Sequence, residues 1–262
     1  NKNFSNLSIR KINLVDIKYN NFSFSSKKIT SKSNSYLSES FNKALQIIKK
    51  VNCAGLINGP ISKKTFLKGK FNGVTEYLAS KTNSKDPVML IYNKSLSVSP
   101  LTTHLPVSKV SKKVNKRDIV IKIMKINSFY KNILKKNPNI AVTGLNPHCE
   151  NFDAENKEKN EIIPAIKYLK KKKLKIDGPF ASDTIFLKKN LKNFDVVFGM
   201  YHDQVLAPMK TLYGFNAINI TLGLPFIRIS PDHGPNVQML GKNSSDASSL
   251  IESILFLKKN GI

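Results

Sequence analysis

The sequence predicts an α/β protein, because segments with a helical spacing of apolar residues alternate with short apolar segments typical of strands. The alternation runs from about residue 36 to the end, with no internal repeat. With 262 residues, 40% of them apolar, the chain can bury a large core in one domain or two lobes. No apolar run approaches the ~18 residues of a membrane-spanning helix.

The N-terminal half opens with a polar region and then a helix. Residues 1–35 are rich in Asn, Ser and Lys and contain one short alternating stretch at 7–17. A helix is expected over 36–52, where apolar residues recur with helical spacing at Leu37, Phe41, Ala44, Leu45, Ile48 and Val51. A strand entering a Gly-Pro loop, a helix, a strand pair and a long helix follow at 53–62, 75–82, 88–104 and 118–136. Asn137-Pro138 ends the long helix.

The C-terminal half repeats the pattern of a strand followed by a loop. The next elements are a strand and loop, a helix, a turn, a strand, two paired strands and a closing helix, at 139–148, 161–172, 176–184, 194–202, 218–222, 226–230 and 249–259. The apolar run FDVVFG before Met200 is expected to be a central strand, buried on both faces, because it lacks polar alternation. A loop containing Pro208 is expected to follow it.

The charge balance is strongly basic, with 43 Lys+Arg, 17 Asp+Glu and a net charge of +26. Such a charge is typical of nucleic-acid binding, but here the lysines are spread along the chain and arginine is nearly absent, so no nucleic acid is expected as a partner. The densest run, 167–175, ends a predicted helix, where positive charge favours the helix dipole. Two cysteines, Cys53 and Cys149, are too few for a disulfide framework and fit a cytoplasmic protein without a membrane segment.

All four histidines follow predicted strands. They are His104, His148, His202 and His233. In open α/β sheets, the carboxyl edge of the strands is where ligands bind, so a shared site is expected there. Imidazole is the commonest metal ligand, and three imidazoles leave a coordination position for water or substrate. Spacing alone leaves open which three of the four would bind a metal.

Four uncommon strings carry a resemblance to a known family: GLNPH, DGPFASDTIF, YHDQVLAPMK and NITLGLPFIRISPDHGPN. They resemble the 4-hydroxythreonine-4-phosphate dehydrogenase family of pyridoxal phosphate (pyridoxine) biosynthesis, a relative of the isocitrate and isopropylmalate dehydrogenases. The resemblance implies two α/β/α lobes around a central cleft, interleaved in one catalytic unit over residues 1–262. The family's opening strand with its GDPAGIGPE-like turn has no counterpart, and the chain starts with Asn1, so an N-terminal portion is expected to be missing.

The resemblance also implies an activity. The family's enzymes are oxidoreductases that oxidise 4-phosphohydroxy-L-threonine with NAD or NADP, after which the product loses carbon dioxide to give 3-amino-2-oxopropyl phosphate. They use a divalent metal (zinc, magnesium or cobalt) and form a homodimer with the active site at the subunit interface. A metal suits both steps, because it lowers the pKa of a bound hydroxyl and stabilises an enolate.

Residue roles follow from the same resemblance. The metal ligands are expected to be His104, His202 and His233, whereas His148 matches a family histidine near the site that is not a ligand. The substrate-binding residues are expected to be Thr75, Lys210, Asn219 and Arg228. Lys210 and His202 are the expected catalytic residues, with Asp203 supporting His202. No cofactor-binding residue is identified, since the family does not use a GxGxxG motif.

Two departures from the family pattern keep alternatives open. Val74 stands where the family has a histidine that contacts phosphate, and the glycine-rich loop after GLNPH is replaced by the polar segment 149–161. Loss of a charge-assisted contact costs about 1.5–3 kcal/mol, so affinity or substrate choice is expected to differ. The alternatives are a 4-phosphothreonate or 4-phosphoerythronate dehydrogenase of the same family and, with less support because an HExxH helix is absent, a metal-dependent hydrolase.

Overall fold

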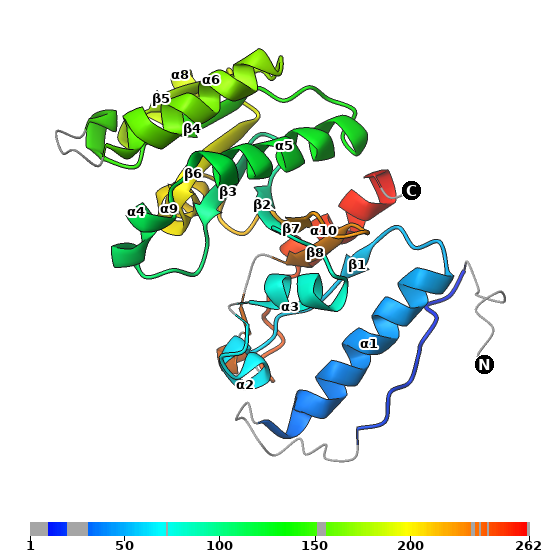
Figure 1. Ribbon diagram of the computed structural model, residues 1–262. Helices are drawn as coiled ribbons and strands as arrows, with labels where there is room; N and C mark the ends of the chain where they lie inside the picture. The colour runs from blue at the N-terminus through cyan, green and yellow to red at the C-terminus, as the bar shows by residue number, and fades with distance from the viewer. Residues whose placement is uncertain are drawn as a thin grey trace.

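The computed structural model describes residues 10–19, 31–71, 73–150, 156–231, 234–235, 237–239 and 241–260. These residues form the expected α/β fold, with one eight-stranded sheet in the order β1-β8-β7-β2-β3-β6-β4-β5 (Figure 1). The strands are β1 Leu56–Ile57, β2 Val88–Tyr92, β3 Ser97–Thr102, β4 Ile140–Thr143, β5 Ile176–Phe180, β6 Val196–Tyr201, β7 Ile218–Leu222 and β8 Arg228–Pro231.

Strand directions decide which loops meet. β3, β6, β4 and β5 are mutually parallel, and β2 runs antiparallel to both β3 and β7. β7 therefore runs in the same direction as β3, while β8 is antiparallel to β7 and parallel to the short edge strand β1. The carboxyl ends of β3, β6, β4 and β7 consequently lie at one edge of the sheet, the edge at which ligands bind in open α/β folds.

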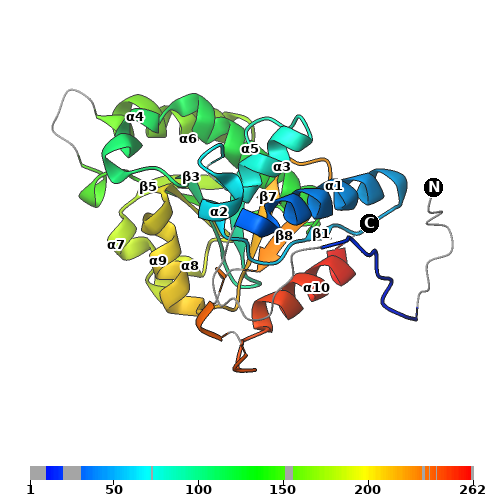
Figure 2. The same cartoon turned by 90° about the horizontal axis from the view of Figure 1, so that it is seen from below.

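Helices cover both faces of the sheet. They are α1 Asn34–Lys50, α2 Lys63–Leu67, α3 Val74–Lys81, α4 Val110–Lys113, α5 Lys116–Asn132, α6 Ile163–Lys171, α7 Ser182–Ile185, α8 Lys188–Leu191, α9 His202–Tyr213 and α10 Ser248–Asn260. Figure 2 shows α1, α3, α5 and α6 on one side of the strands and α7 to α10 on the other. Asn115 caps α5 by accepting a hydrogen bond from the backbone N–H of Asp118 at 2.9 Å.

Three apolar clusters hold these layers together. The largest packs α5 and α6 against the sheet, a second packs α9 against the opposite face, and a third joins α1, α2 and α3 around Phe41 and Tyr77. β6 lies between β3 and β4, and every residue from Val196 to Met200 is buried, with successive side chains entering the first two clusters alternately. The expectation of a central strand buried on both faces is confirmed.

The segment after β6 corrects the sequence prediction. The loop expected around Pro208 is in fact helix α9, which begins at His202 and contains Pro208 in its interior. Val205 and Met209 are four residues apart and both pack into the second cluster, which offsets the hydrogen bond that a proline removes. Asp203 in the first turn complements the helix dipole.

Other differences are local. The segment 176–184, expected to be a turn, contains edge strand β5, whose backbone pairs with β4, and the start of helix α7. The strand expected within 53–62 is only two residues long. Within the alternating stretch 7–17, residues 7–9 lie outside the described part of the chain and the rest form no regular element. No helix in the described ranges has the length and apolar character needed to cross a membrane.

Adjacent residues on α5 provide a test of the core. Ile123 is fully buried in the largest cluster, whereas Met124 is 37% exposed. Replacing Ile123 with Ala removes buried atoms and leaves a cavity, so we expect the free energy of unfolding to fall by about 2–5 kcal/mol. Met124→Ala on the same helix is the matched control and should change it by no more than about 0.5 kcal/mol. Urea denaturation measures both, and equal effects would show that α5 does not pack as described.

Candidate active site

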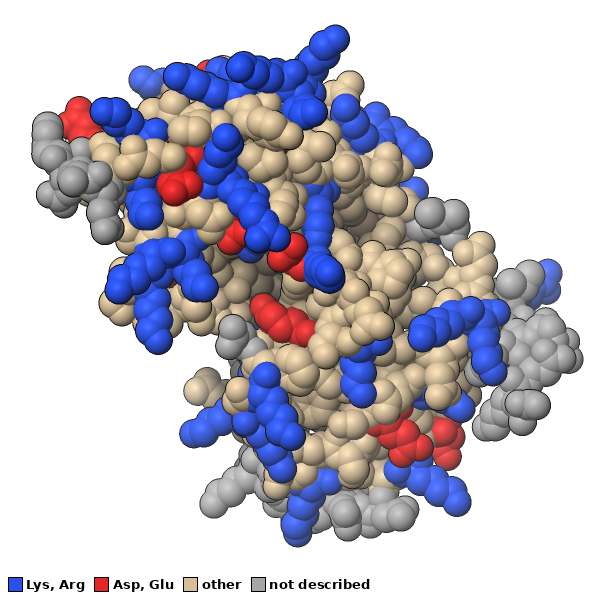
Figure 3. Space-filling view, viewed as in Figure 1, with Lys and Arg blue, Asp and Glu red and all other residues tan. Residues whose placement is uncertain are grey.

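A cavity of about 630 Å³ lies at the carboxyl edge of the strands, and we call it the central cleft. Six residues that the sequence analysis selected line it, namely Thr75, His104, His202, Lys210, Asn219 and Arg228. They come from α3, the loop after β3, helix α9 and strands β7 and β8. The fold thus gathers segments more than 150 residues apart in the sequence. Figure 3 shows Lys and Arg side chains spread over both halves of the face in view.

Two histidines meet because their strands are parallel neighbours. His104 follows β3 and His202 follows β6, and the centroids of their rings lie 5.9 Å apart. Nδ1 of His202 lies 2.7 Å from Oδ1 of Asp203. When Nδ1–H donates to this carboxylate, Nε2 keeps its lone pair for a metal or a proton, the arrangement of metal-binding histidines with a supporting carboxylate. This donor set fits a divalent metal.

Lys63, which the sequence analysis missed, lies beside the first of these histidines. Its Nζ is 3.0 Å from Nε2 of His104. Burial lowers the pKa of Lys63, against an opposing effect of Glu76. Partial desolvation lowers the pKa of His104 as well, and Lys63 lowers it further. A protonated lysine can only donate, so Lys63 must move aside when Nε2 of His104 binds a metal.

Arg228 is the most buried charged group of the central cleft, with 3% of its surface exposed. Its Nε donates to Oδ1 of Asn58 at 2.8 Å, and its Nη1 donates to the hydroxyls of Thr221 at 2.9 Å and Thr75 at 3.4 Å. Burial lowers the pKa of Arg228 to about 10, an effect that Glu76 partly opposes. Within the described part of the chain its hydrogen-bond partners are all neutral, and Glu76 balances its charge in part without a hydrogen bond. The guanidinium can therefore still bind an anion.

Two neutral amide and hydroxyl groups complete this side of the central cleft. The hydroxyl of Thr75 lies 3.3 Å from that of Thr221, and Oδ1 of Asn219 is buried without a hydrogen-bond partner among the described residues. A buried acceptor without a donor is costly unless a ligand supplies one. Val74 begins α3 and lines the central cleft, but most of its side chain packs in the third apolar cluster. The side chain of Val74 is apolar and offers no polar group to a ligand.

Lys210 reaches the central cleft from a helix, which corrects the expectation that a flexible loop carries it. It lies eight residues after His202 on α9, and its Nζ stands 4.6 Å from the ring centroid of Phe215. A helix holds an amine more precisely than a loop does.

His148 is not among the described residues that line the central cleft. His148 follows β4 with φ of 56°, a conformation that is uncommon for residues other than glycine, and its Nδ1 lies 3.9 Å from Oδ2 of Asp183. The buried carboxylate of Glu158 fixes this loop by accepting from the backbone N–H groups of Leu145 at 2.9 Å and Asn146 at 2.8 Å. His233 lies outside the described residues. The residues that the structure does describe contain no complete group of three metal-binding side chains.

The sequence contains only weak signals that Asn58 and Lys63 belong to the site. Both follow β1 in the segment 53–62 or just after it, so they belong to the same pattern of a strand followed by a polar loop. Lysine is too abundant in this chain for one position to stand out, and asparagine is common as well. Only the pairing of β1 with β8 reveals that Asn58 meets Arg228.

Similarity to known proteins extends over nearly the whole chain. The family described as "Pyridoxal phosphate biosynthetic protein PdxA" matches residues 1–257. A protein from Sulfurihydrogenibium sp. (strain YO3AOP1), named 4-hydroxythreonine-4-phosphate dehydrogenase, is 40% identical over 93% of this chain and 74% of its own length. A protein of the same name from Aquifex aeolicus (strain VF5) is 39% identical over 79% of this chain and 65% of its own length.

Solved structures show the same relationship. The crystal structure of 4-hydroxythreonine-4-phosphate dehydrogenase from Klebsiella pneumoniae matches with a TM-score of 0.74 at 29% identity, covering 88% of this chain and 72% of that one. The match of fold and sequence over most of the chain, together with the residues gathered in the central cleft, leads to one conclusion. The chain belongs to the pyridoxal phosphate biosynthetic protein PdxA family, the family of the 4-hydroxythreonine-4-phosphate dehydrogenases.

Proposed function

We propose that this chain oxidises 4-phosphohydroxy-L-threonine with NAD or NADP in a metal-dependent reaction, and that decarboxylation then yields 3-amino-2-oxopropyl phosphate. The observation that carries the proposal is the buried guanidinium of Arg228, bonded only to neutral groups within the described residues and facing the same cleft as two histidines. A phosphorylated hydroxy acid supplies the anion and the hydroxyl that such a cleft would bind. The names of the relatives support the same substrate.

Substrate binding is assigned to four residues of the central cleft. Arg228 provides a fixed planar cation for a phosphate or carboxylate, and Lys210 provides a second cation from α9. Thr75 and Asn219 add hydrogen bonds that orient the substrate, and the unpartnered Oδ1 of Asn219 fits a donor such as the substrate ammonium. We also assign to Lys210 the delivery of the proton to the carbon that loses carbon dioxide.

His104 and His202 are proposed to hold the divalent metal, which is zinc, magnesium or cobalt. When bound, a metal lowers the pKa of the substrate hydroxyl and stabilises the enolate formed on decarboxylation. The third ligand is assigned to His233 from the family resemblance. His148 is an alternative, because it follows β4, the strand beside β6, and its unusual backbone conformation is typical of functional residues.

The assembly and location extend the proposal. Relatives of this kind are expected to act as homodimers with the active site at the subunit interface, so a partner subunit would complete the central cleft. Residues 1–262 would form one catalytic unit of two interleaved lobes in the cytoplasm. Neither nucleic acid nor a membrane is proposed as a partner.

A close second candidate is a dehydrogenase of 4-phosphothreonate or 4-phosphoerythronate. It is favoured by Val74, which presents an apolar side chain where the family has a phosphate-binding histidine. A metal-dependent hydrolase has less support, because the sequence has no HExxH helix. A carboxylate near the central cleft, that of Glu76, interacts with the charges of Lys63, His104 and Arg228.

Turnover with each substrate separates these candidates. Purified protein loaded with zinc, magnesium or cobalt should reduce NAD or NADP with 4-phosphohydroxy-L-threonine faster than with 4-phosphothreonate, as followed by absorbance of the reduced nucleotide. The amino group of the first substrate is what Asn219 is proposed to recognise. A preference for 4-phosphothreonate would favour the second candidate, and phosphate release without nucleotide reduction would favour a hydrolase.

Arg228→Met tests the anion site. Loss of a charge-assisted contact of about 1.5–3 kcal/mol should raise the KM for the phosphorylated substrate roughly 10- to 150-fold. Arg117→Met, on the exposed surface of α5, is the matched control and should leave the KM unchanged. Thermal unfolding of both variants checks the fold. An unchanged KM in folded Arg228→Met would mean that the guanidinium is structural and only joins its three neutral partners.

His202→Ala and Lys210→Ala separate metal binding from substrate chemistry. His202→Ala should lose bound metal and turnover while the protein remains folded, because the variant lacks the imidazole that Asp203 orients. Lys210→Ala should retain the metal and lose turnover. Metal content by mass spectrometry and nucleotide reduction give the two readouts, and full metal stoichiometry in His202→Ala would contradict its assignment.

The same measurement identifies the third ligand. Metal loss in His233→Ala but not in His148→Ala supports the family assignment as stated above, and the opposite result transfers the role to His148.

A further inference from the structure

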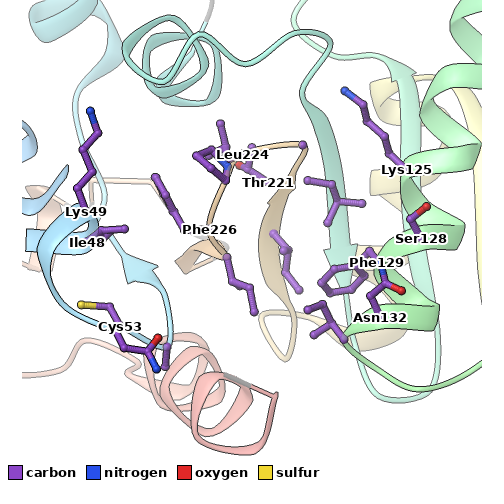
Figure 4. Close-up of a pocket in the computed structure, with 18 of the residues that line it drawn as sticks. Ile48, Lys49, Cys53, Lys125, Ser128, Phe129, Asn132, Thr221, Leu224 and Phe226 are labelled. Carbon is purple, nitrogen blue, oxygen red and sulfur yellow. The ribbon is translucent and has the colours of Figure 1, made fainter. Parts of the chain in front are cut away.

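A second and larger cavity, of about 820 Å³, lies between α1 and α5, and we call it the rear groove. Figure 4 shows Ile48 and Lys49 of α1 on one side of it and Lys125, Ser128 and Phe129 of α5 on the other. The turn between β7 and β8, with Leu224 and Phe226, lies between these two helices. The size falls in the range of about 300–1,000 Å³ that is typical of small-molecule sites.

The rear groove and the central cleft are separated by strand β7. Successive side chains of a strand point to opposite faces. Asn219 lines the central cleft, whereas Ile220 and Leu222 line the rear groove and pack in the cluster of α5. Thr221 also lines the rear groove, and its hydroxyl bonds to Arg228. One strand therefore forms a wall of both cavities.

The rear groove separates two of the apolar clusters. Leu224 and Phe226 pack against the cluster of α1, α2 and α3, whereas Leu222 and Phe129 belong to the cluster of α5 and α6. The space between them has an apolar floor with an aromatic ring on each side. A flat apolar group inserted there would contact both clusters and bury surface that is now open.

The charge of the rear groove specifies the ligand further. Its lining includes Lys49, Lys50 and Lys125, and none of the described residues that line it is acidic. Nζ of Lys125 donates to the carbonyl groups of Lys85 at 2.6 Å and Asp86 at 2.7 Å, which fixes this cation at the rim. An apolar floor with a cationic rim complements a ring that carries one phosphate or carboxylate group.

We propose that the rear groove binds a small aromatic anion, a ring bearing one phosphate or carboxylate, and that its occupancy changes substrate binding in the central cleft. The link is short. Thr221 belongs to the wall of the rear groove and accepts a hydrogen bond from Arg228 at 2.9 Å, and Ile227 of the same wall directly precedes Arg228. A ligand that shifts this wall shifts the guanidinium. Ligand binding in the rear groove does not depend on the proposed function, whereas the effect on substrate binding rests on it.

The fluorescent probe 8-anilinonaphthalene-1-sulfonate, an aromatic anion, tests binding to the whole chain. We expect saturable binding of one probe per chain. Ser128→Trp places an indole in the rear groove from an exposed position of α5 and should abolish this binding, whereas Ser128→Ala leaves the space open and should retain it. Lys49→Glu should weaken binding severalfold. Its matched control, Lys167→Glu on the exposed side of α6, should not.

Competition defines the ligand class. Phenyl phosphate should displace the probe at much lower concentration than inorganic phosphate or benzyl alcohol, because only the first combines ring and anion. Lys210→Ala should leave probe binding unchanged, because Lys210 lines the central cleft and not the rear groove, and this separates the two cavities. Equal probe binding in wild type, Ser128→Trp and Lys49→Glu would overturn the proposal, as would displacement by inorganic phosphate alone.

Kinetics test the link to the central cleft. Phenyl phosphate at a concentration that saturates the rear groove should change the KM for the phosphorylated substrate in wild type but not in Ser128→Trp. Binding with no such difference would overturn the regulatory half of the proposal. The fluorescence measurements need no turnover, so failure of the proposed dehydrogenase activity would leave the result on binding intact.

Discussion

The buried guanidinium of Arg228 is the interaction on which the arrangement of the central cleft depends. Through Asn58, Thr75 and Thr221 it joins the loop after β1, the first turn of α3 and strand β7 to its own strand β8. Hydrogen bonds of a charged group contribute about 1.5–3 kcal/mol each, but burial of an ion costs several kcal/mol. The free-energy cost of burying the arginine is offset in part by the carboxylate of Glu76, and a bound anion would offset it further.

The histidines depend on a different constraint, which is the parallel direction of β3, β6 and β4. Parallel neighbours end at the same edge, so His104, His202 and His148 are delivered there without any contact between their segments in sequence. β6 is buried on both faces, and the helix that starts at His202 packs into the cluster beneath it. Both the strand and the helix restrict His202, whereas His148 relies on a loop fixed by the carboxylate of Glu158.

The two cavities share β7 because a strand has two faces. Asn219 lines the central cleft, the hydroxyl of Thr221 bonds to Arg228, and the apolar residues Ile220 and Leu222 pack in the cluster of α5. A ligand on either face meets the same backbone. This geometry gives the chain a physical route between two sites that needs no long pathway of residues.

The sequence by itself determined the α/β class, the central position of β6, the long helices and the family strings that contain His202, Lys210, Asn219 and Arg228. These features are readable because apolar periodicity and motif residues are local. Only the tertiary structure decided that Pro208 lies within a helix, since the burial of Val205 and Met209 outweighs the local signal of a proline. The same holds for β5, whose Gly-Pro bond looks like a turn until β4 pairs with it. The contacts of Lys63 with His104 and of Asn58 with Arg228 join residues 41 and 170 positions apart, and no local pattern encodes which distant segments become neighbours.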